Sequence, residues 1–263
     1  YEGLDLGAEG SAGLITYMRT DSTNVAKSAI IETTEFIKNQ YGEKYLLPKP
    51  RVYKTKVKGA QEAHEAIRPT SIFNTPEKIK KHLSNDQYRL YKLIWNRMIC
   101  TQMPDALFDQ TKLEISANGK SGKEYVFASV GTVLKFDGYR TVYMESDDDA
   151  KDVLDDKNKL PNLDKGDDLD CSNISKDQHF TEAPPLYTEA TLIKLLEEKG
   201  IGRPSTYAAI MTVIQDRYYV QKTNNRFVST KLGRVVNTLL TQHFADTLNV
   251  GFTAKLEADL DEI

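Results

Sequence analysis

A tyrosine and an arginine stand two positions apart in the polar segment Thr16–Ser22 (TYMRTDS). A tyrosine hydroxyl can attack phosphorus and form an ester that keeps the energy of a phosphodiester bond. Because this hydroxyl is protonated at neutral pH, the attack requires a base, a cation or a concerted proton transfer. Arg19 could stabilise charge on the oxygens of the same phosphate. Tyr17 and Arg19 are therefore candidate catalytic residues, although packing is the alternative for any one of fourteen tyrosines.

A second polar cluster lies at Gln61–Pro69 (QEAHEAIRP). On a helix, His64 and Arg68 are four positions apart and share a face. Such a face could hold a phosphate, with His64 as a proton carrier. The alternative is an ion pair between Arg68 and a glutamate beside a surface histidine, and this cluster taken alone favours that alternative.

The third cluster is Gly200–Tyr207 (GIGRPSTY). Free backbone N–H groups at a helix start, the hydroxyls of Ser205 and Thr206, and the Arg203 guanidinium together predict an anion site. A well-capped helix without a ligand is the alternative. Arg217 and Tyr218 follow at the far end of that helix, where they could contact a nucleic-acid backbone or stack on a base.

The first 103 residues are expected to form a helical domain that carries the first two clusters. Apolar spacing predicts a helix from a cap at Ser22 or Thr23 toward Lys38, and two packed helices within residues 76–102. Residues 60–67 contain no helix breaker and predict a short helix that ends before Pro69.

Residues 104–183 are expected to form a β-rich domain with an acidic insertion. Strands are predicted over residues 111–116, 125–133 and 138–143, since these runs are rich in β-branched and aromatic side chains. The dipeptides Asn118-Gly119 and Asp137-Gly138 supply turns between them.

Residues 184–263 are expected to be helical again. Thr188 is the predicted cap of a helix over residues 189–199, Gly200 its left-handed end, and Pro204 or Ser205 the start of the next helix. A hairpin around Asn224-Asn225 would follow, so the order resembles a winged helix-turn-helix. The predicted fold class is thus α+β with several domains: a helical domain with the tyrosine, a β-rich domain and a winged-helix-like domain.

Composition excludes some classes of protein. Charged residues make up 28% of the 263 residues, and no apolar stretch approaches the ~20 residues that a bilayer requires. One tryptophan, fourteen tyrosines and nine phenylalanines argue against global disorder. Cys100 and Cys171 lie far apart in sequence and neither has a CxxC partner, so we expect no disulfide framework and no zinc ribbon. We therefore expect a reducing compartment, with Cys100 buried.

Charge is unevenly distributed along the chain, although the net charge is only -3. Lys44–Lys58 contains six cations and no acid, whereas Glu145–Asp170 contains eleven acidic residues against four lysines. Solvated surface is the ordinary interpretation of such runs. Asp147–Asp149 lacks the glycine and spaced glutamate of a calcium loop, so we predict no metal site there.

The motifs resemble those of one family, the type IA DNA topoisomerases. Leu14–Ser22 is similar to the family's active-site signature, and three further segments match in the expected order: Gln61–Thr70 (QEAHEAIRPT), Gly200–Ala208 (GIGRPSTYA) and Gly251–Glu257 (GFTAKLE). Met18, together with the versions of the second and third motifs found here, favours the bacterial topoisomerase I branch over the topoisomerase III branch.

The resemblance implies an activity and a role for each motif. Tyr17 would attack a single-strand phosphodiester, form a 5′-phosphotyrosine and release a 3′-hydroxyl, while Arg19 holds the scissile phosphate. His64, Arg203, Ser205, Thr206 and Arg217 would lie near the path of the single strand. The helical domain would be lifted on arches of the β-rich domain, which admits the second strand and relaxes negative supercoils without ATP.

The resemblance also implies parts that this sequence does not contain. The family's N-terminal acidic domain (TOPRIM), which binds Mg²⁺ and supplies a glutamate, has no counterpart in this chain, and the chain begins at Tyr1 rather than at a methionine. We therefore expect a piece of a longer protein that binds no metal itself and cleaves DNA weakly or not at all alone. The expected substrate is the single-stranded part of negatively supercoiled DNA, and the expected state a monomer in the bacterial cytoplasm, associated with the nucleoid.

Two other functions stay open on the residues alone. A non-catalytic nucleic-acid-binding module would bind reversibly and in a salt-sensitive way, without a covalent bond through Tyr17. A phosphoesterase with a tyrosine nucleophile would leave a broken strand as its final product, whereas a topoisomerase reseals it.

Overall fold

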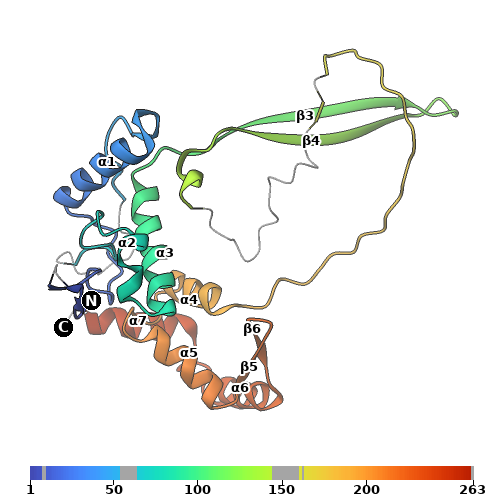
Figure 1. Ribbon diagram of the computed structural model, residues 1–263. Helices are drawn as coiled ribbons and strands as arrows, with labels where there is room; N and C mark the ends of the chain where they lie inside the picture. Colours follow the sequence, from blue (N-terminus) through green and yellow to red (C-terminus); the bar gives the residue numbers. More distant parts are fainter. Residues whose placement is uncertain (8–9, 54–63, 144–159, 162, 262–263) are drawn as a thin grey trace. The chain divides into compact units, whose positions relative to one another are not determined.

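The computed structural model describes residues 1–7, 10–53, 64–143, 160–161 and 163–261 (Figure 1). These residues form two compact units, the first ending at Ser172 and the second beginning at Asn173. The mixture of helices and strands confirms the predicted α+β class. The acidic triplet Asp147–Asp149 and the basic residues Lys54, Lys56 and Lys58 lie outside the described residues. No helix within the described ranges is long and apolar enough to cross a membrane.

The body of the first unit is helical. Its elements are a two-residue strand pair, three α-helices and two 3₁₀ helices: β1 (Leu4–Asp5), β2 (Ser11–Ala12), α1 (Lys27–Tyr41), η2 (Glu43–Tyr45), α2 (Pro76–Ile79), η3 (Lys80–His82) and α3 (Asn85–Thr101). Ile37 of α1, Ile99 of α3 and Met103 just after it are fully buried. The Trp95 indole N–H donates to the Ile72 carbonyl at 2.9 Å inside the same core. The two helices predicted within residues 76–102 are thus confirmed.

Helix α1 begins later than predicted, at Lys27. The Ser22 hydroxyl accepts a hydrogen bond from the Asn24 N–H at 3.2 Å, which is a local turn rather than a helix cap. The Asn24 carbonyl then accepts from the Ala66 N–H at 2.7 Å. Residues 22–26 are not helical, and within them the Asn24 carbonyl binds the second cluster instead of a helical N–H group.

The prediction of a helix over residues 60–67 is wrong for residues 64–67, the part that the structure describes. Residues 64–67 form no helix, and residues 60–63 lie outside the described ranges. The N–H groups of Ala66 and Arg68 donate to residues far away in sequence, Asn24 and Thr16, instead of to a preceding helical turn. Pro69 contributes to this outcome, since the residue before a proline avoids the helical conformation.

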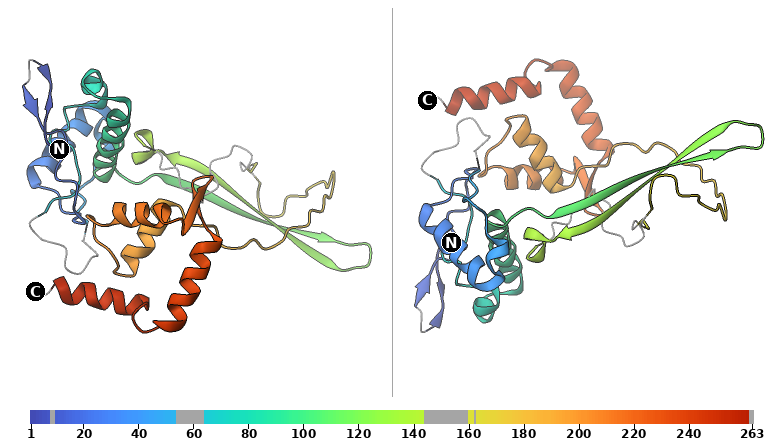
Figure 2. Two further views of the ribbon diagram at one scale, coloured as in Figure 1. Left: turned by 90° about the horizontal axis from the view of Figure 1, so that it is seen from below. Right: turned by 90° about the horizontal axis from the view of Figure 1, so that it is seen from above.

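A long hairpin follows the helical body, formed by β3 (Leu107–Asn118) and β4 (Glu124–Phe136) (Figures 1 and 2). The turn at Asn118-Gly119 is confirmed, but the strand predicted over residues 138–143 is wrong. A 3₁₀ helix, η4 (Gly138–Thr141), lies there instead. Gly138 has a φ of 49°, which turns the chain back so that the Tyr139 N–H reaches the Pro104 carbonyl at 3.0 Å. The Tyr45 hydroxyl binds Asp137 at 2.8 Å and ties the base of the hairpin to the helices.

The second unit contains four helices and a short hairpin in its described residues: α4 (Glu189–Glu198), α5 (Tyr207–Asp216), β5 (Val220–Thr223), β6 (Arg226–Ser229), α6 (Lys231–His243) and α7 (Val250–Asp261). Thr188 caps α4 as predicted, accepting from the Thr191 N–H at 3.2 Å. Gly200 has the predicted left-handed φ, 71°. Asn224 and Asn225, with φ of 48° and 64°, form the predicted hairpin turn.

Helix α5 begins at Tyr207, after a turn over residues 204–206, and therefore later than predicted. The predicted order of helix, turn, helix and hairpin is present. The boundaries at residues 103 and 183 and the assignment of the three domains stay predictions. Within the described part of residues 104–183, the β structure is the single β3–β4 hairpin.

The two cysteines are expected to differ strongly in reactivity. Cys100 is buried and its thiol donates to the Tyr139 carbonyl at 3.5 Å, while Cys171 is exposed. Burial raises the pKa of the Cys100 thiol from 9.0 to about 11, so the folded protein keeps it protonated. At pH 8 we expect iodoacetamide to modify Cys100 at least about 100-fold more slowly than Cys171, since only the thiolate reacts. Peptide mass spectrometry over time measures both rates. Equal rates in the folded chain would contradict this expectation, whereas equal rates in denaturant are the control.

Candidate functional site

The first two polar clusters lie side by side, although they are fifty residues apart in sequence. The Thr16 N–H donates to the Arg68 carbonyl and the Thr70 N–H to the Leu14 carbonyl, both at 3.0 Å. Ile15 and Pro69 form an antiparallel bridge between these bonds. The short β-like pairing fixes the backbone directly before the candidate nucleophile, Tyr17.

The Tyr17 ring lies between two other aromatic rings. Its centroid is 5.3 Å from that of Tyr1, in an edge-to-face arrangement, and 5.7 Å from that of His64. Tyr17 is 36% exposed, so a ligand can approach it from solvent. The structure therefore brings the candidate nucleophile and the candidate proton carrier together.

The two arginines near Tyr17 have different surroundings. Arg19 is exposed, and no hydrogen bond or ion pair joins it to another described residue. Arg68 is only 13% exposed in its side chain; its Nε and Nη2 donate to Oε2 of Glu65 at 3.0 and 2.6 Å, and its Nη1 to the Pro69 carbonyl at 2.9 Å. Arg68 therefore holds its own segment together. This is the ion-pair alternative, on an extended segment rather than on a helix.

In the third cluster, a carboxylate binds where an anion was predicted. Oε2 of Glu257, on α7, accepts from the Gly202 N–H at 2.8 Å and from Nη1 of Arg203 at 2.9 Å. The Thr206 hydroxyl is bonded to the backbone of Arg203, which leaves Ser205 as the exposed hydroxyl with no bond in the described chain. The geometry can bind an anion, and an internal side chain supplies one.

Arg217 and Tyr218 follow α5 on the surface of the second unit. Tyr218 is 68% exposed and has a left-handed φ of 55°, and its carbonyl accepts from the Thr230 hydroxyl at 2.6 Å. Arg217 is exposed as well. Both side chains are therefore accessible to a ligand, as their predicted role requires.

The sequence profile of the family described as DNA topoisomerase matches residues 1–263, the whole chain. The chain belongs to the DNA topoisomerase family. Its relatives include the DNA topoisomerase 1 of Rickettsia felis, 48% identical, and that of Xylella fastidiosa strain Temecula1, 46% identical, each over the full chain. These matches confirm the resemblance to bacterial topoisomerase I.

A solved structure is also similar to this topoisomerase chain. The structure of full-length topoisomerase I from Thermotoga maritima matches all 263 residues of this chain, with 33% sequence identity and a TM-score of 0.73. The chain spans 33% of the Rickettsia felis protein, 32% of the Xylella fastidiosa protein and 40% of the Thermotoga maritima chain.

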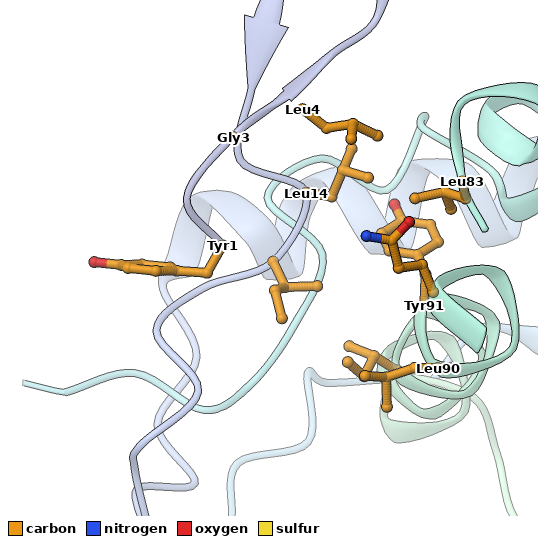
Figure 3. Close-up of a pocket in the computed structure, with 10 residues that line it drawn as sticks. Tyr1, Gly3, Leu4, Leu14, Leu83, Leu90 and Tyr91 are labelled. Carbon is orange, nitrogen blue, oxygen red and sulfur yellow. The ribbon is translucent and has the colours of Figure 1, made fainter.

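Two residues at the candidate sites were not predicted from the sequence, Tyr1 and Glu257. Tyr1 packs against Tyr17 because β1 and β2 fold the start of the chain back. The fold brings Tyr1 so close to Gly13 that a Cβ at residue 13 would lie 2.7 Å from the Tyr1 carbonyl oxygen. Tyr1 also forms one wall of an apolar cavity of about 190 Å³ with Leu14, Leu90 and Tyr91 (Figure 3). Glu257 belongs to a segment that resembles the family, but no sequence signal links it to Arg203.

The described residues do not fit a magnesium site. No group of three or more histidine, cysteine, aspartate or glutamate side chains lies close enough in the described ranges to hold a metal ion. Beside Tyr17, the Glu65 carboxylate already accepts two hydrogen bonds from Arg68. The described part of the chain therefore offers no ligand set for magnesium next to the candidate nucleophile.

Proposed function

We propose that this chain is the nucleophile-bearing part of an ATP-independent type IA DNA topoisomerase that cleaves and reseals one strand of negatively supercoiled DNA. The observation that carries the proposal is the exposed Tyr17 side chain, whose ring lies beside that of His64 and which stands two residues before the exposed Arg19. Phosphoryl transfer to a tyrosine can use an imidazole to carry the proton and a guanidinium to stabilise charge on the phosphate oxygens.

In the proposed reaction, Oη of Tyr17 forms a bond to phosphorus as the bond from phosphorus to the 3′ oxygen breaks. The tyrosine loses its proton, and the departing 3′ oxygen gains one. Arg19 stabilises the charge on the phosphate oxygens, and His64 carries the proton or binds the phosphate. The reverse reaction reseals the strand, and no ATP is consumed because the phosphotyrosine keeps the energy of the broken bond.

The second unit is proposed to bind the single strand through Arg203, Ser205, Thr206, Arg217 and Tyr218. The accessible Ser205, Arg217 and Tyr218 support this role. Arg203 would reach a phosphate by exchanging its bond with Glu257. In the first unit, Arg68 is less available than Arg19 to bind a phosphate of the strand, because Glu65 and Pro69 already bind its guanidinium.

The remaining parts of the proposal concern the whole protein. Lifting of the helical domain on the β-rich arches would admit the second strand. Mg²⁺ would be held by the acidic domain outside this chain, so the chain alone would cleave DNA weakly or not at all. We propose a monomer that acts on the nucleoid in the bacterial cytoplasm.

A covalent trapping assay tests the proposed function. A single-stranded oligonucleotide labelled at its 3′ end is mixed with Mg²⁺ and one of two proteins. The first is this chain alone. The second, the full-length carrier, is a topoisomerase as long as the relatives that contains this chain. We expect the label to migrate at protein mass in denaturing gels, strongly with the full-length carrier and weakly or not at all with the chain alone. Reversible, salt-sensitive binding without an adduct would favour the binding module, and a broken strand as final product would favour the phosphoesterase.

Replacing Arg19 with alanine in the full-length carrier is expected to lower the rate of adduct formation by about 10²–10³-fold, the usual cost of losing one donor to a developing charge. The melting temperature should stay within about 1 °C, because Arg19 is exposed and makes no hydrogen bond within the described chain. Rapid-quench cleavage and calorimetry measure the two effects. Arg68→Ala is the matched control: it should lower the melting temperature, since Glu65 loses its partner. If the Arg19→Ala variant cleaved at the normal rate, the proposed catalytic role of Arg19 would be wrong.

A further inference from the structure

The hydroxyl of Thr16 joins the two segments that carry Tyr17 and His64. It donates to the Ala66 carbonyl at 2.7 Å and accepts from the Arg68 N–H at 3.0 Å. The Thr16 N–H also donates to the Arg68 carbonyl at 3.0 Å. A longer bond from the same hydroxyl reaches the Arg68 carbonyl at 3.5 Å. Thr16 therefore makes four hydrogen bonds across the pairing, three of them through its side chain.

This residue stands directly before Tyr17, and Ala66 is two positions after His64. The Tyr17 and His64 rings, 5.7 Å apart, lie on segments without helix or extended ladder to hold them. The second segment is fixed on its other side by the bond from the Ala66 N–H to the Asn24 carbonyl. The position of Tyr17 relative to His64 therefore depends on the bonds of Thr16 more than on regular secondary structure.

We infer that Thr16 is a positioning residue, whose hydroxyl sets the register of Tyr17 against His64 for the attack on phosphorus. The inference rests on the proposed function. A reacting group displaced by about 1 Å can lose about 10²-fold in rate. Valine has the shape of threonine but can neither donate to Ala66 nor accept from Arg68, so it frees both segments to shift.

The matching residue for comparison is Thr70, at the other end of the same pairing. Its hydroxyl donates to the Gly13 carbonyl at 2.6 Å, and its N–H donates to Leu14. Thr70→Val therefore also removes a hydroxyl bond between the two segments. It does so farther from Tyr17, and at an exposed residue.

In the full-length carrier, we expect Thr16→Val to slow single-turnover cleavage by about 10–100-fold while the Kd for a single-stranded oligonucleotide changes less than about twofold. Thr16→Ser, which keeps the hydroxyl, should restore the rate to within about threefold, and Thr70→Val should cleave nearly normally. A slow Thr16→Ser variant, or equal losses in Thr16→Val and Thr70→Val, would overturn the inference, because a general loss of stability would then explain the rates.

A second measurement does not depend on activity. In the 263-residue chain, the nuclear Overhauser effect between the Tyr17 and His64 ring protons should be present in the wild type and in Thr16→Ser, and lost or much weaker in Thr16→Val. An unchanged effect in Thr16→Val would overturn the inference. If the wild-type full-length carrier forms no adduct, the proposed function fails, and the ring-to-ring effect still decides whether Thr16 positions Tyr17.

Discussion

Replacing Tyr17 with phenylalanine is expected to abolish the covalent adduct between protein and DNA. Phenylalanine lacks the hydroxyl that would bond to phosphorus, and loss of a nucleophile lowers rates by more than about 10³-fold. The substitution should leave the fold intact, because the ring contacts with Tyr1 and His64 need no hydroxyl. The affinity for a single-stranded oligonucleotide should therefore change little.

The measurement is the trapping assay with the full-length carrier, followed by nuclease digestion and peptide mass spectrometry to find the modified tyrosine. Tyr125→Phe is the matched control: Tyr125, on β4, is 45% exposed, and its ring lies near the Lys123 ammonium. It should form the normal amount of adduct. An adduct that persists in Tyr17→Phe would assign the nucleophile to another residue and overturn the proposed function as stated.

The individual polar clusters of the candidate site could be predicted from the sequence, but the close approach of the first two clusters in space could not. Tyr17 and Arg19 are close in sequence, so their chemistry is visible in one short segment. The pairing of Leu14–Thr16 with residues 66–70 depends on single hydrogen bonds between distant residues, without periodicity to indicate it. The same bonds explain why residues 64–67 are not helical although the sequence there contains no helix breaker.

Elements that depend on local interactions were predicted well. Thr188 caps α4 through its own neighbour Thr191, and the Asn224-Asn225 turn needs only two residues that tolerate a left-handed φ. The Arg203 site depends instead on Glu257, fifty-four residues away. A local pattern could indicate that an anion binds there, but not that the chain supplies the anion itself.

At the base of the β3–β4 hairpin, a strand was predicted over residues 138–143, but the 3₁₀ helix η4 lies there. Asp137-Gly138 is a good turn sequence, but its role is to fold the chain onto the end of α3. A Cβ at residue 138 would lie 2.5 Å from the Pro104 carbonyl oxygen and 2.6 Å from the carbonyl carbon of Asp105. These are backbone atoms, so they cannot rotate away as a flexible side chain would.

Gly138→Ala is therefore expected to destabilise the first unit by about 2–5 kcal/mol. About 1–2 kcal/mol comes from the left-handed φ of 49°, and the rest from overpacking against Pro104 and Asp105. Trp95 is the chain's one tryptophan and is buried in the core of this unit, so its fluorescence during urea unfolding reports the loss.

Gly122→Ala separates the two causes of this loss. Gly122 has a φ of 77°, but nothing lies within 4 Å of the Cβ that alanine would add. It should therefore show only the backbone cost, about 1–2 kcal/mol at most, at the far end of the hairpin. If Gly138→Ala were no more destabilising than Gly122→Ala, the close approach of η4 to Pro104 would not hold the hairpin to the helices. The bond between Tyr45 and Asp137 would then be the main link between them.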